Sequence, residues 1–304
     1  MTAFTLAHFS DPHLPYEPRL DWRQRFSKRI LSAWSWHRSR RAVQRPDILA
    51  ALADDVRAQQ PDHIAVTGDI TNFSLPGEFE QAAAWLRTLG DGARVSVVPG
   101  NHDALVPVAP AEGWDHWQPW MRSDDADATQ WPYLRLRGDV ALIGVSSALP
   151  TPPTIAGGRV GAAQLAALEA LLDAQRGRFR VVLVHHPLAD GAVSRRKALR
   201  DRAELRAVLQ RAGCELVLTG HARDARLDLL DGATAPIVCL GLPSSTAAPN
   251  AHDQGARWHA LRIEKQSSDW RLSVAVRLWD EATGAFCSGG TYDYRLPRTG
   301  AIAV

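Results

Sequence analysis

Short apolar segments that each end in a polar cluster recur through the first 220 residues, and they constrain the fold more than any other feature. Five of these segments lead directly into possible metal ligands: Asp11-Pro12-His13, Gly68-Asp69, Gly100-Asn101-His102-Asp103, His185-His186 and Gly220-His221. Stretches with apolar residues at helical spacing separate most of them: 46–60, 78–89, 162–175 and 202–213. This alternation of strands and helices predicts an α/β fold.

The pattern changes after residue 235, where strand-like segments follow one another without long helices between them. Within 271–278, Leu and Val alternate with Arg, Ser and Ala, and this period of two is typical of antiparallel strands with one buried face. A single α/β domain over residues 1–304, with two facing sheets, explains both halves. We expect a basic aromatic insertion at about 19–45 and an irregular Trp- and Pro-rich insertion at about 104–133.

The five polar clusters are expected to meet in space, because sites in open α/β sheets form beyond the carboxyl ends of the strands. Carboxylates and imidazoles suit Mn, Fe or Zn ions. An aspartate can bridge two metal ions that lie about 3.5–4 Å apart. Glycines before Asp69, Asn101 and His221 permit sharp turns and close backbone approach. The sequence therefore predicts a site for two divalent or trivalent metal ions.

This ordered set of motifs resembles that of the calcineurin-like metallophosphoesterase superfamily, which is D-x-H, G-D, G-N-H-D/E, H and G-H-x-H. The counterparts in this chain are DPH (11–13), GD (68–69), GNHD (100–103), VHHP (184–187) and GHAR (220–223). The resemblance covers about residues 4–245. It implies a four-layer α/β/β/α sandwich of two mixed β-sheets flanked by helices. It also implies hydrolysis of a phosphoester, with a phosphodiester or pyrophosphate favoured, by a metal-activated hydroxide.

The resemblance also assigns the metal ligands residue by residue. Asp11 and His13 would bind the first metal, Asp69 would bridge, and the second metal would be bound by Asn101, His185 and His221. His185 is preferred over His186 because the family ligand usually stands two residues before a proline, here Pro187.

Three further residues would act on the substrate or support the ligands. His102 would donate to the phosphoryl oxygens or protonate the leaving oxygen, and Asp103 would orient it as a catalytic partner. The alternative for Asp103 is the capping of a turn or helix. His186 would stand behind the ligands or face the substrate.

The last motif departs from the family pattern, because Arg223 stands where the family has a second histidine that binds the first metal. A guanidinium has no lone pair to give to a metal. Another residue or water could complete the shell of the first metal, or that metal could bind weakly. Arg223 could instead contact a phosphate of the substrate through its planar fork. Catalysis could also be impaired, which would leave a binding or regulatory module.

The 19–45 segment mixes arginines with large apolar residues, and three interpretations remain open. It could be an amphipathic helix that packs its Trp and Ile side chains on the domain while the arginines face water. It could contact a membrane surface through residues 22–40, because basic helices with Trp and Phe favour anionic interfaces. It could also contact a nucleotide or oligonucleotide. We expect the substrate to be a small-molecule or lipid-linked phosphoester. The alternative is that the protein is a cyclic-nucleotide or nucleic-acid phosphodiesterase.

The overall charge and the apolar runs bear on the binding partners and the cellular location of the protein. A net charge of +2 without a long basic stripe argues against a stable nucleic-acid complex. No apolar run approaches the ~20 residues needed to span a bilayer, and the N-terminal apolar stretch is too short for a secretory signal. We therefore expect a cytoplasmic protein, with contact at the inner membrane surface if the 22–40 segment binds lipid.

Overall fold

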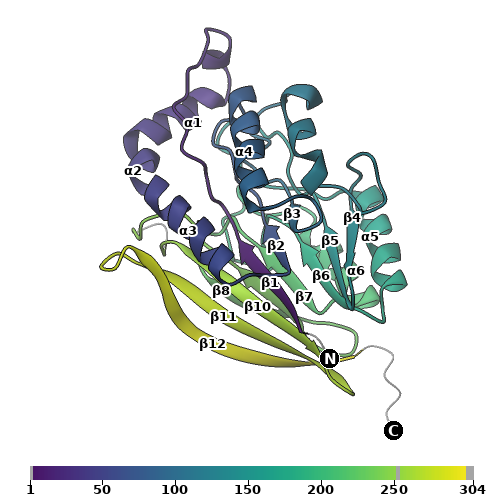
Figure 1. Ribbon diagram of the computed structural model, residues 1–304. Coiled ribbons are helices and arrows are strands. Elements are labelled where there is room, and N and C mark those ends of the chain that lie inside the picture. Colours follow the sequence, from purple (N-terminus) through teal and green to yellow (C-terminus); the bar gives the residue numbers. More distant parts are fainter. Residues whose placement is uncertain (1–2, 251–253, 299–304) are drawn as a thin grey trace.

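The computed structural model describes residues 3–250 and 254–298, and its framework is a pair of six-stranded β-sheets (Figure 1). The first sheet consists, in spatial order, of β12 (Ala285–Pro297), β11 (Asp269–Asp280), β10 (Arg257–Lys265), β1 (Phe4–Phe9), β2 (His63–Val66) and β3 (Val95–Val97). The second consists of β4 (Tyr133–Arg137), β5 (Val140–Gly144), β6 (Phe179–Leu183), β7 (Leu216–Thr219), β9 (Ile237–Gly241) and β8 (Arg226–Leu230).

Both sheets are mixed, with parallel strands at the side that carries the polar clusters. In the first sheet β1, β2 and β3 run parallel, and β10, β11 and β12 continue the sheet in antiparallel pairing. In the second sheet β5, β6, β7 and β9 run parallel, and β4 and β8 close its two ends in antiparallel pairing. Parallel strands of one sheet end at the same edge, so the loops that follow them are brought together there.

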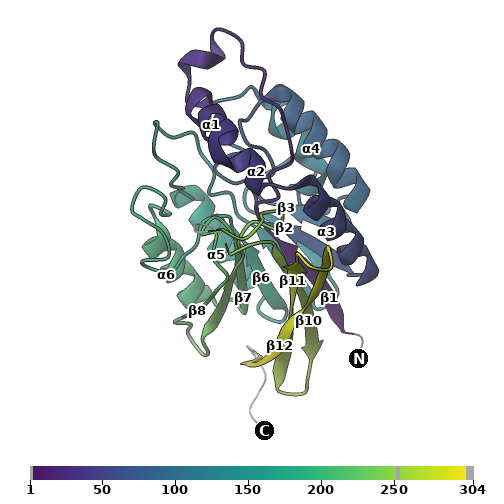
Figure 2. The same ribbon diagram turned by 90° about the vertical axis from the view of Figure 1, so that its left-hand side faces the viewer.

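Helices cover the outer face of each sheet, as the two views in Figures 1 and 2 show. The helices are α3 (Pro46–Ala58) and α4 (Pro76–Leu89) on the first sheet and α5 (Ala162–Ala174) and α6 (Arg202–Ala212) on the second. Phe9 of β1 meets Trp85 of α4 with 6.1 Å between ring centroids. On the second sheet, Val182 belongs to the same buried cluster as Leu168 and Leu209 of the two helices. The predicted four-layer α/β/β/α sandwich is therefore confirmed.

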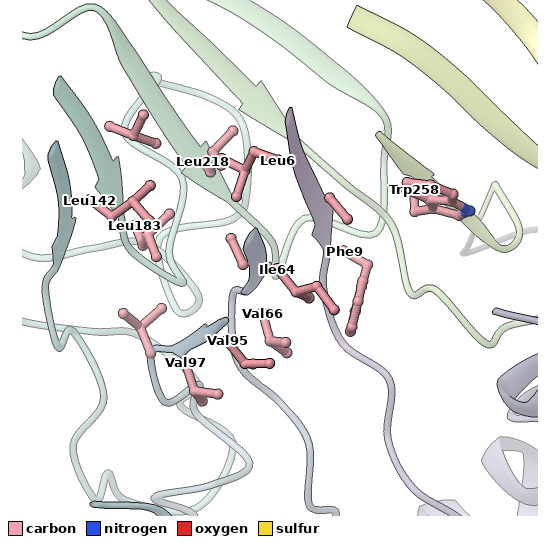
Figure 3. Packing of buried hydrophobic residues seen from close by; sticks show 14 of the residues in the cluster. Leu6, Phe9, Ile64, Val66, Val95, Val97, Leu142, Leu183, Leu218 and Trp258 are labelled. Carbon is pink, nitrogen blue, oxygen red and sulfur yellow. The ribbon is translucent and has the colours of Figure 1, made fainter. Parts of the chain in front are cut away.

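The main core lies between the two sheets (Figure 3). Leu6 and Val95 from the first sheet and Leu142, Leu183 and Leu218 from the second are all buried in one cluster. The parallel strands of the second sheet are buried on both faces, which explains why they appear in the sequence as continuous apolar runs rather than as alternating ones. This burial fixes the two sheets relative to each other and so fixes the loops at their shared edge.

The strand pattern of the sequence predicts the inner strands but not β4 and β8. Both are short strands at the ends of the second sheet. β8 alternates half-buried and exposed side chains, and β4 carries two arginines among five residues. End strands bury fewer of their side chains than strands inside the sheet, so their apolar pattern in the sequence is weaker.

The two segments expected as insertions contain short helical turns. Residues 19–45 form η1 (Gln24–Phe26), α1 (Arg29–Ser35), the π-helical turn η2 (Trp36–Arg40) and α2 (Arg41–Val43). Residues 104–133 contain the 3-10 turns η3 (Pro110–Glu112) and η4 (Trp114–Trp120). Among the residues that the structure describes, no helix has the length and apolar character needed to cross a bilayer.

Candidate metal centre

The loops that follow β1, β2, β3, β6 and β7 bring side chains from distant parts of the sequence into two overlapping groups. Ligand atoms of Asp69, His185 and His221 all lie within 4.8 Å of one another, and so do those of His13, Asp69 and His102. Asp69 belongs to both groups. The convergence that the five polar clusters imply is therefore present in the fold.

Main-chain carbonyls orient the histidines of the group formed by Asp69, His185 and His221, which corresponds to the predicted second metal site. The Nδ1–H of His185 donates to the carbonyl of Thr67 at 2.6 Å, and the Nε2–H of His221 donates to the carbonyl of Lys197 at 3.0 Å. Each ring therefore keeps its other nitrogen for a metal ion, which that nitrogen can bind once it carries no proton.

Asp69 lies between the two groups. Its Oδ1 accepts a hydrogen bond from the backbone N–H of His102 at 2.7 Å. Its Oδ2 lies 3.5 Å from Nε2 of His185 and 3.9 Å from Nε2 of His13. Asn101 Oδ1 lies 3.3 Å from the same Nε2 of His185. Two imidazoles, an amide oxygen and a shared carboxylate fit a divalent metal ion at the second site, with Asp69 placed to bridge.

The predicted first metal site, around Asp11 and His13, has fewer atoms that could bind a metal ion. Nε2 of His13 lies 4.0 Å from Asp11 Oδ1, and its Nδ1–H donates to the carbonyl of Thr71. The other oxygen of Asp11 accepts hydrogen bonds from Ser10 Oγ and from the backbone N–H of His221. Asp11 and His13 therefore each present one donor atom, and the shared Asp69 supplies a third.

Arg40 lies beside this first group. Its Nη2 lies 3.2 Å from Nε2 of His13, and its Nη1 lies 3.4 Å from Nε2 of His102. Burial, together with the nearby cation of Arg223, lowers the pKa of Arg40 to about 10. With Arg223 in place of a histidine and Arg40 against His13, the residues fit a metal ion less completely at the first site than at the second.

The buried charges set the protonation of the groups. Burial lowers the pKa of His185, but the carboxylates of Asp69 and Asp11 outweigh this effect and raise it to about 9. Burial, with a further contribution from Arg40, lowers the pKa of His102 to about 3. His185 must therefore give up a proton before it can bind a metal ion, while His102 is neutral without a ligand nearby.

The backbone is strained at several of the predicted ligands. Asp11, Asp69 and His221 have φ angles of 50°, 56° and 67°, in the left-handed region that residues with a side chain rarely adopt. Gly220 is required by close approach, because a Cβ at this position would overlap Ser10 Oγ and Asp11 Oδ2. Strain of this kind is typical of functional sites, where the surrounding structure compensates for it.

Asp103 does not orient His102 as expected. Its carboxylate accepts hydrogen bonds from the backbone N–H groups of Asp69, Gly100 and Thr71, each at 2.8 Å. The Nδ1–H of His102 instead donates to the carbonyl of Asn72 at 2.9 Å. The capping alternative therefore describes Asp103 better, since its carboxylate ties together the loops that carry the ligands.

His186 is buried behind the ligands. Its Nδ1 is paired with the hydroxyl of Ser147 at 2.8 Å, and its Nε2–H donates to the carbonyl of Ala156 at 3.2 Å. Its ring packs on those of His185 and His221, with centroids 5.1 and 4.5 Å away. Of the two roles considered for His186, this position favours support of the ligands over contact with a substrate.

A pocket of about 400 Å³ opens beside Asn101 and His102. Three cationic side chains line it, namely Lys28, Arg40 and Arg223. Its apolar lining includes Leu31, Trp34, Leu105 and Ile155. The pocket therefore combines positive charge suited to a phosphate with a surface suited to an organic substituent.

Arg40 and Asn72 are site residues that the sequence pattern does not single out. The signal for Arg40 is indirect: its arginine-rich segment follows closely after Asp11 and His13. Asn72 acts through its main-chain carbonyl, which has no side-chain signature. Its own backbone N–H donates to Glu78 at the start of α4, and this hydrogen bond holds the loop in place.

The sandwich fold and the paired Asp and His groups define a metal-dependent phosphoric ester hydrolase. The chain belongs to the calcineurin-like phosphoesterase family, whose model matches residues 4–222. Both the family and the enzyme class predicted from the motifs are thus confirmed.

The chain is also similar to individual proteins. A probable cyclic nucleotide phosphodiesterase of Synechococcus sp. is 24% identical over 228 residues, which span 74% of this chain and 80% of the relative. The calcineurin-like phosphoesterase YfkN from Bacillus subtilis has a TM-score of 0.45 at 12% identity, covering 99% of this chain and 92% of YfkN. Vacuolar Protein Sorting 29 from Cryptosporidium parvum has a TM-score of 0.48 at 11% identity, covering 96% and 98%.

Proposed function

We propose that this protein hydrolyses a phosphodiester, and that the phosphoryl group binds where the cationic pocket meets the metal ligands. The observation that carries this proposal is the pocket itself, in which Lys28, Arg40 and Arg223 lie beside Asn101 and His102. Metal ions bound there would polarise the phosphoryl oxygens and lower the pKa of a bound water. We still expect two metal ions, of Mn, Fe or Zn. The residues at the second site fit a metal ion better than those at the first site.

His102 is the residue that we assign to proton transfer. Its Nδ1–H is committed to the Asn72 carbonyl, so Nε2 is the atom that faces Arg40 and the pocket. A phosphate anion bound beside this ring favours its protonated form. The proton on Nε2 can then be donated to the leaving oxygen.

The apolar side of the pocket favours a diester over a monoester. A diester carries one negative charge and two organic groups, and Leu31, Trp34 and Ile155 offer a surface for one of those groups. A pyrophosphate has the same two-sided character. A cyclic nucleotide is the second candidate, supported by the name of the Synechococcus relative.

A substrate panel tests the proposal. With added Mn²⁺, we expect kcat/KM for bis(p-nitrophenyl) phosphate to exceed that for p-nitrophenyl phosphate by about tenfold, equivalent to about 1.4 kcal/mol. Cyclic AMP and a nucleoside diphosphate ester in the same panel separate the diester candidates, and EDTA should remove the activity. If metal stimulates none of these reactions, the binding or regulatory module becomes the better interpretation.

Replacement of Arg223 by histidine tests the incomplete first site. The substitution supplies an imidazole at the family's ligand position and removes a cation next to Arg40. We expect the weaker metal affinity to tighten by on the order of 10- to 100-fold, measured by calorimetric titration with Mn²⁺. Arg195→His, an exposed replacement of the same type, is the matched control. An unchanged weak affinity in R223H would show that Arg223 does not limit metal binding.

A further inference from the structure

The helical turns of residues 22–41 expose their large apolar side chains to solvent. The exposed residues, with the accessible fraction of each, are Trp22 (68%), Phe26 (88%), Ile30 (42%), Leu31 (47%) and Trp34 (63%). We call these five residues the aromatic surface. They make up most of the large hydrophobic side chains that are exposed anywhere in the described residues; the others are Leu136, Leu227 and Leu229. A patch of this concentration on a protein surface marks an interaction site.

Two cationic side chains of the same segment point inward. Lys28 Nζ donates to Thr151 Oγ1 and to the carbonyl of Ile155, and Arg29 donates to the carbonyls of Phe73 and Ser74. A surface helix normally buries its apolar side and exposes its charges. Here the arrangement is reversed at these residues, although Trp36 does pack inward against Phe73 with 5.8 Å between ring centroids. The amphipathic helix with Trp packed on the domain therefore describes Trp36 but not the aromatic surface.

The charges that do face solvent around the aromatic surface are mainly positive. Among the charged residues of 17–41 that are exposed, five are arginines and two are acidic, Glu17 and Asp21; the arginines are Arg19, Arg23, Arg25, Arg38 and Arg41. The guanidinium of Arg23 lies 5.0 Å from the ring centroid of Trp22, and that of Arg38 lies 5.4 Å from that of Trp34. Exposed Trp and Phe side chains set among arginines complement the headgroup region of an anionic bilayer, which is negative at its surface and apolar just below it.

We propose that the aromatic surface docks on an anionic phospholipid membrane, with Trp22 and Phe26 entering the headgroup region and the neighbouring arginines facing lipid phosphates. Leu31 and Trp34 also line the pocket beside the metal ligands. The docked face therefore borders the pocket mouth, and the membrane would lie next to the site of hydrolysis. Docking itself needs no catalytic activity, so it can be tested independently of the proposed reaction.

Vesicle co-sedimentation tests this proposal with the full chain. We expect the wild-type protein to sediment with phosphatidylcholine vesicles that contain 30 mol% phosphatidylglycerol, and to do so poorly with phosphatidylcholine alone. The double variant Trp22→Ser/Phe26→Ser should lose at least tenfold in affinity for the anionic vesicles, since neither side chain is part of the core or of the pocket. Added salt should weaken binding of the wild type, because the arginine contacts are screened.

The matched control is Leu227→Ser/Leu229→Ser on β8, where both side chains are also exposed, at 49% and 58%. It should sediment like the wild type, and thermal melting checks that both double variants are folded. Equal binding by the wild type and W22S/F26S, or equal binding to neutral and anionic vesicles, overturns the proposal. So does a wild-type dimer that W22S/F26S converts to a monomer in light scattering, since a second copy would then cover the surface.

Discussion

Replacement of Asp69 by asparagine is expected to lower metal-dependent diester hydrolysis by on the order of 10³-fold, or about 4 kcal/mol of transition-state stabilisation. Oδ2 of Asp69 faces both His13 and His185, so one carboxylate oxygen is placed to serve both of the metal positions that we propose. Asparagine can keep the hydrogen bond from the His102 N–H, but it presents an N–H₂ group or a neutral oxygen to the metals. The measurements are kcat/KM with added Mn²⁺ and the metal content of the purified chain.

Asp173→Asn provides the control for D69N. Asp173 is a surface carboxylate on α5 that pairs with Arg176, so its replacement removes the same charge far from the ligand groups. It should leave both activity and metal content near the wild-type values. If D69N kept activity within threefold of the wild type, Asp69 would not be a shared ligand and the arrangement of the centre would need to be revised.

Replacement of His102 by alanine is expected to lower kcat by about 10²- to 10³-fold for a diester with an alkyl leaving group. The loss should be much smaller for bis(p-nitrophenyl) phosphate, because p-nitrophenolate leaves without needing a proton. Nε2 of His102 faces Arg40 and the pocket, so its removal takes away the proton donor that we assign to the leaving oxygen.

The metal content of H102A separates proton transfer from metal binding. His102 shares a potential ligand group with His13 and Asp69, so a direct role in metal binding is the competing explanation. Unchanged metal content together with dependence on the leaving group supports proton transfer. An equal loss for both leaving groups, accompanied by loss of metal, would identify His102 as a ligand instead.

The convergence of the polar clusters can be predicted from the sequence because each one follows an apolar strand. The periodicity of such strands is set by burial, and the direction of parallel strands then decides where the next residues lie. Asp11, Asp69 and His221 come together in this way although they are separated by up to 210 positions. The ends of the strands thus determine where the loop residues lie, whatever side chains the loops carry.

The contacts that the sequence does not predict come from irregular chain segments. Arg40 reaches His13 from a π-helical turn, where no strand periodicity specifies the direction of a side chain. Asp103 was expected to orient His102, but its carboxylate instead accepts hydrogen bonds from three backbone N–H groups of the loops around the site. The group that a carboxylate or a histidine N–H meets depends on loop geometry, which the residue types do not specify.

The anchoring of the histidine rings by carbonyls has a consequence for how the gene can vary. The acceptors at Thr67, Thr71, Asn72 and Lys197 are main-chain oxygens. At Lys197, whose side chain is exposed, a codon change leaves the acceptor in place, provided that the loop keeps its path. The side chains of Thr67, Thr71 and Asn72 are buried and make hydrogen bonds of their own, to His8, to Asp103 and to the carbonyl of Leu14. A substitution at one of these three positions therefore removes a second contact, even though the main-chain acceptor remains.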